Sequence, residues 1–339
     1  MIGVRNGVKR RARLVALGAH VPERIVTNAE MAEAVDTSDE WIFSRTGIRE
    51  RRFAAEDEAS SDLAVHAANR IIAEAGIDPL EINMLIVPTA SPDHIFPATA
   101  TLVAERIGAH NAAAFDILAG CTGFIYGLAQ ATAFIESGIA QNVLVVGAEA
   151  LSKITDQTDR RTCVLFGDAA AGALLIAEDE DKITGFLGFE LGADGAGGPD
   201  LVVPAGGSRM PAQDGPFAPG ESCIQMNGRE VFKFASRVMV ESCTRLLDAL
   251  EIPVADIDLL VAHQANQRII DHAIDRLGIP PDRVFNNLEL YGNTSSASIP
   301  LAMLEARDAG QLSSGDLVLL VGFGAGLTWG STILRYEPT

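Results

Sequence analysis

Two pairs of segments in this 339-residue chain resemble each other at one common offset. IDPLEINMLIVPTA begins at Ile77 and IPVADIDLLVAHQA at Ile252, which is an offset of 175 residues (252 − 77). NVLVVGAEA from Asn142 and LVLLVGFGA from Leu317 are separated by the same 175 residues (317 − 142). Buried strands can resemble each other by chance, but a shared offset indicates that the chain is a duplication of one unit.

The pattern within each unit predicts an α/β fold. Strand and helix patterns alternate, and the repeated strands are continuous apolar runs, as expected for strands covered on both faces. The length suffices for two similar lobes, and 32 glycines with only 6% aromatic residues favour close packing of small side chains. We predict an N-terminal half over residues 1–180 and a C-terminal half over residues 181–339.

The repeat also brings chemically active residues to corresponding places. Shifting Cys121 by the offset gives position 296 (121 + 175), three residues after Asn293. Shifting Pro88 gives His263 (88 + 175), at the end of its strand. Two such halves would bring these strand ends to a common seam, where α/β proteins favour ligand sites.

Cys121 stands between a strand and a helix, in AGCTGF. The positive end of the helix dipole favours the thiolate, and Gly120 and Gly123 let a substrate approach the backbone. The Cys121 N–H points toward the place where an oxyanion would form. A buried, inert cysteine is the alternative, and it is our interpretation of the other three cysteines, Cys163, Cys223 and Cys243.

His263 and Asn293 each have an ordinary structural explanation. A histidine at a strand end is often structural, and Asn293 in GNTSS could cap the next helix. Taken together with Cys121, however, they lie at corresponding ends of a duplicated fold. A thiolate beside hydrogen-bond donors suits acyl transfer through a covalent thioester.

Several classes of partner are disfavoured. The cysteines and six histidines show no metal-ligand spacing, VGFGAGLTWG fails the dinucleotide pattern, and we expect no metal and no cofactor. A net charge of −19 argues against nucleic acid, and no apolar run approaches the ~20 residues that a membrane helix needs. The cysteine usage suggests a cytoplasmic protein. We expect a solvated basic tail at the N-terminus, with Arg5, Lys9, Arg10, Arg11 and Arg13.

Eight motifs, in order, make the chain resemble the β-ketoacyl-acyl-carrier-protein synthase III family, the initiating condensing enzymes of bacterial fatty acid synthesis. The resemblance runs from about Leu14 to Tyr336, on DTSDEWIFSRTGIRERR, GCTGF, TDRRT, FGDAAAGA, MNGREVF, HQANQRI, GNTSSASIP and GFGAGLTWG. It implies the thiolase fold, a duplicated five-layer αβαβα arrangement, and a homodimer. It also implies that an acyl-coenzyme A primer is condensed with malonyl-acyl carrier protein.

The resemblance further implies roles for single residues. Cys121 would be the acylated nucleophile, and His263 and Asn293 would bind the malonyl thioester carbonyl. Three residues would hold coenzyme A, namely Trp41, Arg45 and Arg160, although a core tryptophan and surface arginines are the plain alternative. Asn266 would lie beside them near the active-site water network, and Phe96 would cap the acyl pocket of the partner subunit.

Some positions depart from the family pattern. Ala325 replaces a glycine whose N–H completes the oxyanion hole with that of Cys121, and we expect strain there if its φ is positive. Arg229 stands where some relatives have a different polar group near the cofactor tunnel. The glycine-rich segment over residues 191–210 is expected to be a surface loop.

A basic helical face after His263 is a candidate docking surface for an acidic carrier protein. Arg268, His272 and Arg276 are four residues apart, so they share one face, and Lys233 and Arg237 could extend it. A solvated face that balances neighbouring acids is the alternative. Three other functions also stay open: a condensing enzyme of secondary metabolism, a cysteine hydrolase and a noncatalytic acyl-binding protein.

Overall fold

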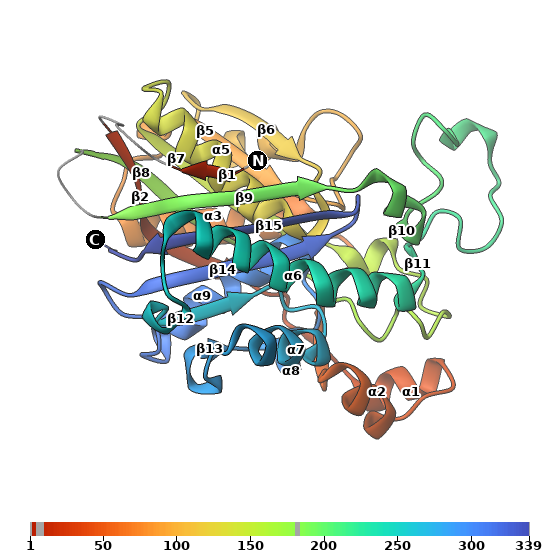
Figure 1. Ribbon diagram of the computed structural model, residues 1–339. Helices are drawn as coiled ribbons and strands as arrows, with labels where there is room; N and C mark the ends of the chain where they lie inside the picture. The colour runs from red at the N-terminus through yellow and green to blue at the C-terminus, as the bar shows by residue number, and fades with distance from the viewer. Residues whose placement is uncertain (1, 5–9, 180–183, 339) are drawn as a thin grey trace.

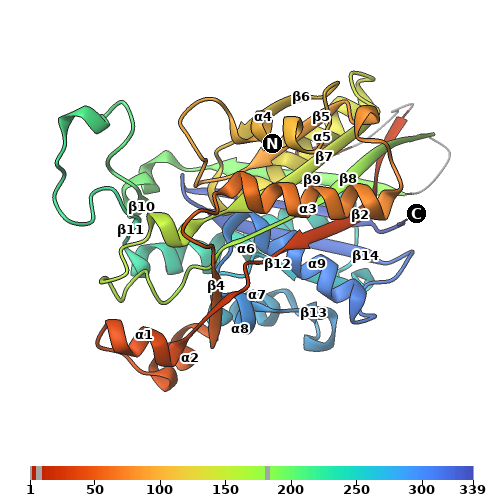
Figure 2. The same cartoon turned by 180° about the vertical axis from the view of Figure 1, so that it is seen from behind.

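Two β-sheets, with helices between and outside them, build the molecule (Figure 1 and Figure 2). The computed structural model describes residues 2–4, 10–179 and 184–338. The first sheet has five strands in the order β2-β8-β7-β5-β6. Their bounds are β2 (Arg10–His20), β8 (Ala169–Asp179), β7 (Asn142–Glu149), β5 (Met84–Pro88) and β6 (Ala113–Ile117).

The second sheet repeats this order and adds one strand at its edge. Among the described residues it has six strands, in the order β1-β9-β15-β14-β12-β13. Their bounds are β1 (Ile2–Val4), β9 (Gly185–Ala193), β15 (Thr328–Arg335), β14 (Leu317–Gly324), β12 (Leu259–Ala262) and β13 (Val284–Phe285). In both sheets the central pair is parallel and the next pair is antiparallel, so the strand directions repeat as well.

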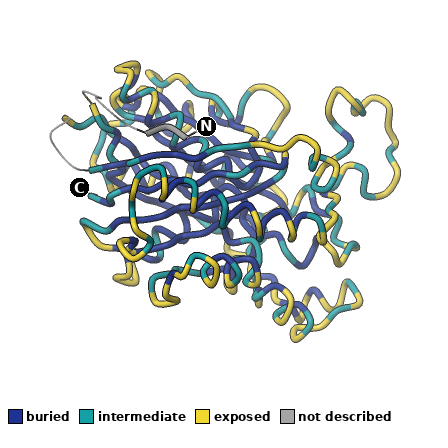
Figure 3. The backbone as a smooth tube through the Cα atoms, in the orientation of Figure 1, coloured by how far each residue is buried: buried dark blue, intermediate teal, exposed yellow. Residues whose placement is uncertain are grey.

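Helices complete five layers. Between the sheets lie α5 (Gly123–Glu136) and α9 (Ser298–Asp308), whose apolar faces share one core with both sheets. Outside the first sheet lie α3 (Ser60–Ala75) and α4 (Thr99–Arg106), and outside the second lie α6 (Gly228–Leu250) and α7 (Gln267–Leu277). Figure 3 shows buried backbone through the sheets and exposed backbone at the loops. The predicted αβαβα thiolase fold is confirmed.

The 175-residue offset holds to the residue at the elements nearest the seam. Strands β7 and β14 begin at 142 and 317 and end at 149 and 324. The short 3-10 turns η2 (Gly120–Thr122) and η8 (Ser295–Ala297) have the same offset, as do the starts of α5 and α9. The duplication predicted from sequence is therefore present in three dimensions.

The remaining elements form a lobe beside α7 and a flap near the ends of the strands. The lobe contains β3 (Arg24–Thr27), α1 (Asn28–Ala34), α2 (Asp39–Thr46), β4 (Glu50–Phe53) and α8 (Leu288–Tyr291). The flap contains β10 (Leu201–Val202) and β11 (Gln225–Met226). Gly47 ends α2 with φ +83°, and a Cβ there would lie 2.6 Å from Gln267 Cβ, so α2 packs closely on α7. The ribbon shows this lobe below the sheets, next to α7 (Figure 1).

The expected solvated N-terminal tail is wrong in part. Residues 2–4 form β1, which pairs with β9 of the other half. Arg10, Arg11 and Arg13 belong to β2, and Arg13 forms an ion pair of 2.6 Å with Glu178. Arg5 and Lys9 lie outside the described residues, as does the predicted boundary at 180/181, which stays a prediction.

Candidate active site

Cys121 lies at the junction of two cavities. It sits in η2 directly before α5 and is 8% exposed. It lines both a wide cavity of about 420 Å³ and a narrow one of about 90 Å³. The nucleophile predicted from sequence thus borders two cavities.

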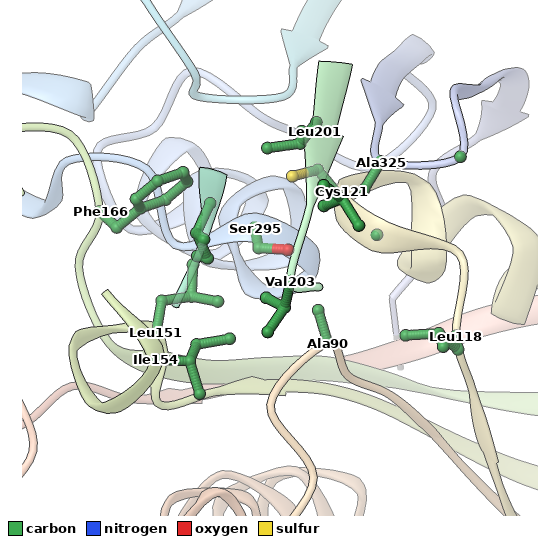
Figure 4. Close-up of a pocket in the computed structure, with 14 residues that line it drawn as sticks. Ala90, Leu118, Cys121, Leu151, Ile154, Phe166, Leu201, Val203, Ser295 and Ala325 are labelled. Atoms are coloured by element: carbon green, nitrogen blue, oxygen red, sulfur yellow. The ribbon is translucent and has the colours of Figure 1, made fainter. Parts of the chain in front are cut away.

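The wide cavity is mainly apolar and suits an acyl chain (Figure 4). Leu118, Leu151, Ile154 and Phe166 line it from the N-terminal half. The segment at 201–203 closes another side. The expectation that residues 191–210 are simply a surface loop is therefore wrong: part of this segment is β10, and its apolar side chains face the cavity.

The narrow cavity brings the other two predicted residues to Cys121. His263 and Asn293 both line it, together with Asn266 and Phe232. His263 directly follows β12, and Asn293 precedes η8 in the matching turn of the C-terminal half. Cys121, His263 and Asn293, which are far apart in sequence, therefore meet at the seam between the two halves.

His263 is a neutral imidazole. It is fully buried, and burial lowers its pKa to about 3. Its Nδ1 lies 2.7 Å from Ser298 Oγ, which also accepts the Gln264 N–H at 3.4 Å. If Ser298 donates its hydroxyl proton to Nδ1, the ring proton is on Nε2, which has no protein partner within the described structure. His263 can then donate one hydrogen bond into the narrow cavity.

Asn293 is held so that its donor end is available. Its Oδ1 accepts the Ser295 N–H at 2.8 Å, which closes a local turn before η8, but the N-cap residue of η8 is Thr294 and not Asn293. The backbone N–H of Asn293 donates to the Leu165 carbonyl at 2.8 Å. These bonds use the acceptor oxygen and fix the backbone, which leaves the side-chain NH₂ as a second donor beside His263.

Burial works against ionisation of the Cys121 thiol, and its activation at the helix start stays a prediction. Burial raises its pKa to about 12. The carboxylate of Glu149 raises the pKa further. Desolvation therefore opposes the thiolate that the start of α5 was expected to favour.

Two backbone N–H groups lie near the thiol in a tight junction. A Cβ on Gly120 would lie 2.7 Å from the Ala325 nitrogen, and a Cβ on Gly324 would lie 2.4 Å from the Cys121 nitrogen. The nitrogens of Cys121 and Ala325 thus belong to closely packed turns beside the wide cavity. Ala325 does not have positive φ, so the strain we considered there does not arise.

The residues expected to hold coenzyme A gather beside the narrow cavity. Two guanidinium groups lie near the Trp41 ring, that of Arg45 at 5.0 Å and that of Arg160 at 5.2 Å from its centroid. Asn266 caps α7 by accepting the Arg268 N–H, and its Nδ2 donates to the Arg45 carbonyl at 3.1 Å. Asn266 therefore also has a structural role, because it ties the Trp41 helix to the helix at the cavity.

The proposed docking residues lie on two packed helices. Arg268 and Arg276 are exposed on α7, where His272 lies between them. The Arg268 guanidinium lies 5.4 Å from the Phe232 ring, which lines the narrow cavity. On α6, Lys233 pairs with Glu230 at 2.7 Å. Arg237, also on α6, pairs with Glu241 at 2.9 Å.

Phe96 does not reach the acyl cavity of its own chain. It is 83% exposed, and Ile95 beside it is 81% exposed. Leu118, at the rim of the wide cavity, is 79% exposed. Three large apolar side chains thus lie open near β6, the edge strand of the first sheet.

Sequence reasoning missed Ser295 and Glu149. Ser295 lines the wide cavity with Cys121, and Glu149 is a fully buried carboxylate at the end of β7. The repeat could have found both: Ser295 corresponds to Gly120 and Glu149 to Gly324 at the same offset, and Glu149 is the one charge in an apolar strand.

The described structure contains no group of three or more His, Cys, Asp or Glu side chains placed to hold a metal ion. Within the same residues, no helix is long and apolar enough to cross a membrane.

Comparisons with known proteins agree with this architecture. Two family profiles match, 3-oxoacyl-[acyl-carrier-protein] synthase III over residues 115–195 and its C-terminal region over residues 247–336. Beta-ketoacyl-[acyl-carrier-protein] synthase III of Symbiobacterium thermophilum is 52% identical over 96% of this chain and 98% of its own. The crystal structure of the Thermus thermophilus synthase III has TM-score 0.89 and 52% identity, covering 96% and 99% of the two chains.

One solved structure comes from another kind of pathway. The priming β-ketosynthase of the R1128 polyketide pathway has TM-score 0.89 and 34% identity, with 99% of this chain and 100% of that chain covered.

Fold, site and comparisons define an acyltransferase of the condensing-enzyme class, built on the thiolase fold. Within that class, the chain belongs to the β-ketoacyl-acyl-carrier-protein synthase III family.

Proposed function

We propose that this chain condenses a short acyl-coenzyme A primer with malonyl-acyl carrier protein and so starts fatty acid synthesis. The observation that carries the proposal is the position of Cys121, which lines both an apolar cavity and the narrow cavity that holds the donors His263 and Asn293. The names of relatives about 50% identical over nearly the whole chain support the same reaction.

The first half-reaction acylates Cys121. The sulfur attacks the primer thioester, and the N–H groups of Cys121 and Ala325 stabilise the oxyanion. Coenzyme A leaves, and the acyl chain occupies the wide cavity. Trp41, Arg45 and Arg160 hold the adenine and phosphate part of coenzyme A, since an aromatic face and guanidinium groups suit these two chemistries.

The second half-reaction uses the narrow cavity. His263 and Asn293 donate hydrogen bonds to the malonyl thioester oxygen and stabilise the enolate that forms as carbon dioxide leaves. The carbanion attacks the acyl-Cys121 carbonyl and gives β-ketoacyl-acyl carrier protein. A neutral histidine fits this role, because charge develops on the substrate oxygen and a donor is needed there throughout.

The partners follow from exposed surfaces. A second copy of the chain would cover Ile95, Phe96 and Leu118 and place Phe96 over the acyl pocket of its partner. The acidic carrier protein would dock on Arg268, Arg276 and Lys233. The four cysteines are free, which is consistent with a reducing cytoplasm.

The test incubates purified protein with acetyl-coenzyme A and malonyl-acyl carrier protein and measures the product by mass. We expect a β-ketoacyl product. We also expect Cys121 to gain about 42 Da, because one acetyl group replaces a hydrogen. Cys121→Ala should give neither, with Cys243→Ala as the matched buried control. If the Cys121→Ala protein still gained an acetyl group on another cysteine, the assignment of Cys121 as the nucleophile would be contradicted.

A condensing enzyme of secondary metabolism is the second candidate, because the R1128 priming ketosynthase shares the fold at 34% identity. Parallel assays with a fatty acid carrier protein and a polyketide carrier protein separate the two. A preference for the polyketide carrier would favour the second candidate.

A further inference from the structure

Arg51 is a fully buried arginine to which the proposed function gives no role. It lies in β4, in the lobe that carries Trp41. Its guanidinium donates to three uncharged oxygens, the Val26 carbonyl at 3.3 Å, Asn28 Oδ1 at 2.9 Å and the Val164 carbonyl at 2.8 Å. A cation buried against neutral acceptors is costly, and an apolar side chain could fill the same space at less cost. The residue therefore calls for an explanation beyond packing.

The hydrogen bonds of Arg51 join the lobe to the N-terminal half. Val26 and Asn28 belong to β3 and α1 of the lobe, whereas Val164 lies in the loop before β8. Asn28 continues the network, because its Nδ2 donates to Asp39 Oδ1 at 2.9 Å, and Asp39 is the first residue of α2. Arg51 thus fixes a carbonyl of the N-terminal half from a lobe that is itself held together by hydrogen bonds.

Residues 164–167, called the 164–167 segment, hold the backbone of Asn293. The Leu165 carbonyl accepts the Asn293 N–H at 2.8 Å, and the Gly167 N–H donates to the Asn293 carbonyl at 3.0 Å. Phe166 accordingly forms a parallel bridge with Asn293. Both backbone groups of Asn293 are therefore bonded to the segment whose first carbonyl is fixed by Arg51.

The stem of Arg51 also packs against both partners of this bridge. A Cβ on Gly167 would lie 3.1 Å from Arg51 Cβ, and a Cβ on Gly292 would lie 3.4 Å from the same atom. Gly292, with φ +62°, directly precedes Asn293, and its added Cβ would lie 2.7 Å from the Leu165 carbonyl oxygen. A displacement of Arg51 would therefore reach the Asn293 turn through close contacts as well as through hydrogen bonds.

We propose that Arg51 is a positioning residue for Asn293, an inference that rests on the proposed function. Its guanidinium fixes the 164–167 segment, and this segment fixes Asn293 so that the side-chain NH₂ donates to the malonyl thioester oxygen. Cys121 is placed by other contacts, since its turn packs against Gly324 at the end of β14. Arg51 should therefore serve malonyl decarboxylation much more than Cys121 acylation.

The test uses Arg51→Met, which keeps an apolar stem and removes the donors. Decarboxylation of saturating malonyl-acyl carrier protein, followed by the mass of the carrier, should fall roughly 10- to 100-fold, since a displacement near 1 Å can cost this much. Acylation of Cys121 at saturating acetyl-coenzyme A should stay within about threefold of wild type, because a shift of the lobe would then appear in KM and not in the rate. Arg24→Met is the matched control, because Arg24 is an exposed arginine of β3 that pairs with Glu30 in the same lobe.

A double-mutant cycle distinguishes positioning of Asn293 from a general loss of structure. In an Asn293→Ala protein the donor is already gone, so adding Arg51→Met should slow decarboxylation by less than about twofold, whereas independent effects would multiply. Arg51→Lys keeps the charge but not the planar fork, so it should slow decarboxylation only about fivefold. Should Arg51→Met fail to fold, Arg51→Lys in the same two backgrounds completes the cycle.

Three results would overturn the positioning role and leave the proposed function standing. They are unchanged decarboxylation in the folded Arg51 variants, equal slowing of both half-reactions, and effects that multiply fully with Asn293→Ala. Absence of decarboxylation in wild type would overturn both the role of Arg51 and the proposed function.

Discussion

His263 illustrates how burial alone sets the chemistry of one residue. Its pKa of about 3 lies well below the unfolded value of 6.5. Between these values the unfolded chain binds a proton that the folded chain excludes, so stability is present above pH 6.5 and is lost as pH falls toward 3.

The first prediction concerns the loss of stability at low pH that the buried His263 should cause. From pH 7 to pH 5, the free energy of unfolding of wild type should fall by about 2 kcal/mol through this residue, at 1.36 kcal/mol per pH unit below 6.5. His263→Asn should lack this part of the fall. Urea unfolding of both proteins at the two pH values measures the difference, and parallel pH profiles would show that His263 does not contribute.

The second prediction separates the two half-reactions. His263→Ala or Asn293→Ala removes one donor to the enolate, so malonyl-carrier decarboxylation should fall roughly 100- to 1000-fold. Cys121 acylation should persist in the Asn293 variant, because that residue lies on the malonyl side. If Asn293→Ala blocked acylation and spared decarboxylation, the roles would be reversed.

For single residues, the sequence predicted which side chains form the site better than it predicted their pKa or their backbone conformation. Cys121, His263 and Asn293 could be found because the repeat and the motifs mark positions in the chain. The raised pKa of the Cys121 thiol could not be predicted, since it depends on how completely other segments exclude water. The conformation of Ala325 was equally hidden, because a replaced glycine does not reveal its φ.

Among the elements, the contact between η2 and the end of β14 is the tightest part of the site. Gly324 has no space for a methyl group, since a Cβ would lie 2.4 Å from the Cys121 nitrogen. Backbone atoms cannot move aside as a flexible side chain can, so the nucleophile turn would have to shift.

The third prediction follows from that contact. Gly324→Ala should slow Cys121 acylation about 100-fold, since a displacement near 1 Å can cost this much. Gly195→Ala is the matched control, because no atom lies within 4 Å of its added Cβ. Stopped-flow release of coenzyme A measures both. If Gly324→Ala and Gly195→Ala were acylated at equal rates, the turn that carries Cys121 would be able to shift without loss of activity.

The fourth prediction concerns α7. Arg268→Glu should raise KM for malonyl-acyl carrier protein and leave acetyl-coenzyme A acylation unchanged, because a rim charge acts mainly on encounter. The wild-type carrier KM should rise with salt and respond less in the variant. Arg10→Glu is the control, since Arg10 begins β2 at the end remote from the site. Equal carrier KM at low salt would exclude Arg268 as a docking residue.

The elements differed in how far they could be predicted. Strands β7 and β14 and the turns before α5 and α9 follow from one offset, because buried parallel strands leave a strong apolar signal. The 201–203 segment gave no such signal. Its glycine-rich surroundings indicate a loop, while its apolar side chains face a cavity that only the assembled sheets create.

For the whole molecule, the open apolar side chains near β6 predict the assembly. Phe96→Asp should convert the proposed dimer to a monomer at micromolar concentration, because dimer formation would bury the new charge. Leu290→Asp is the control, an exposed apolar residue on α8 at the other end of the molecule (Figure 1). Sedimentation velocity distinguishes the dimer from the monomer in each variant. A Phe96→Asp protein that sediments like wild type would contradict the interface.

The three-residue strand β1 has a consequence for how the chain is made and handled. It covers β9, which would otherwise be the open edge of the second sheet, and its partners are residues 188–190. During synthesis, β1 can therefore pair only after that distant strand has emerged from the ribosome. An uncovered edge invites pairing with other chains. Strand β1 thus keeps this edge of the sheet from pairing with other chains.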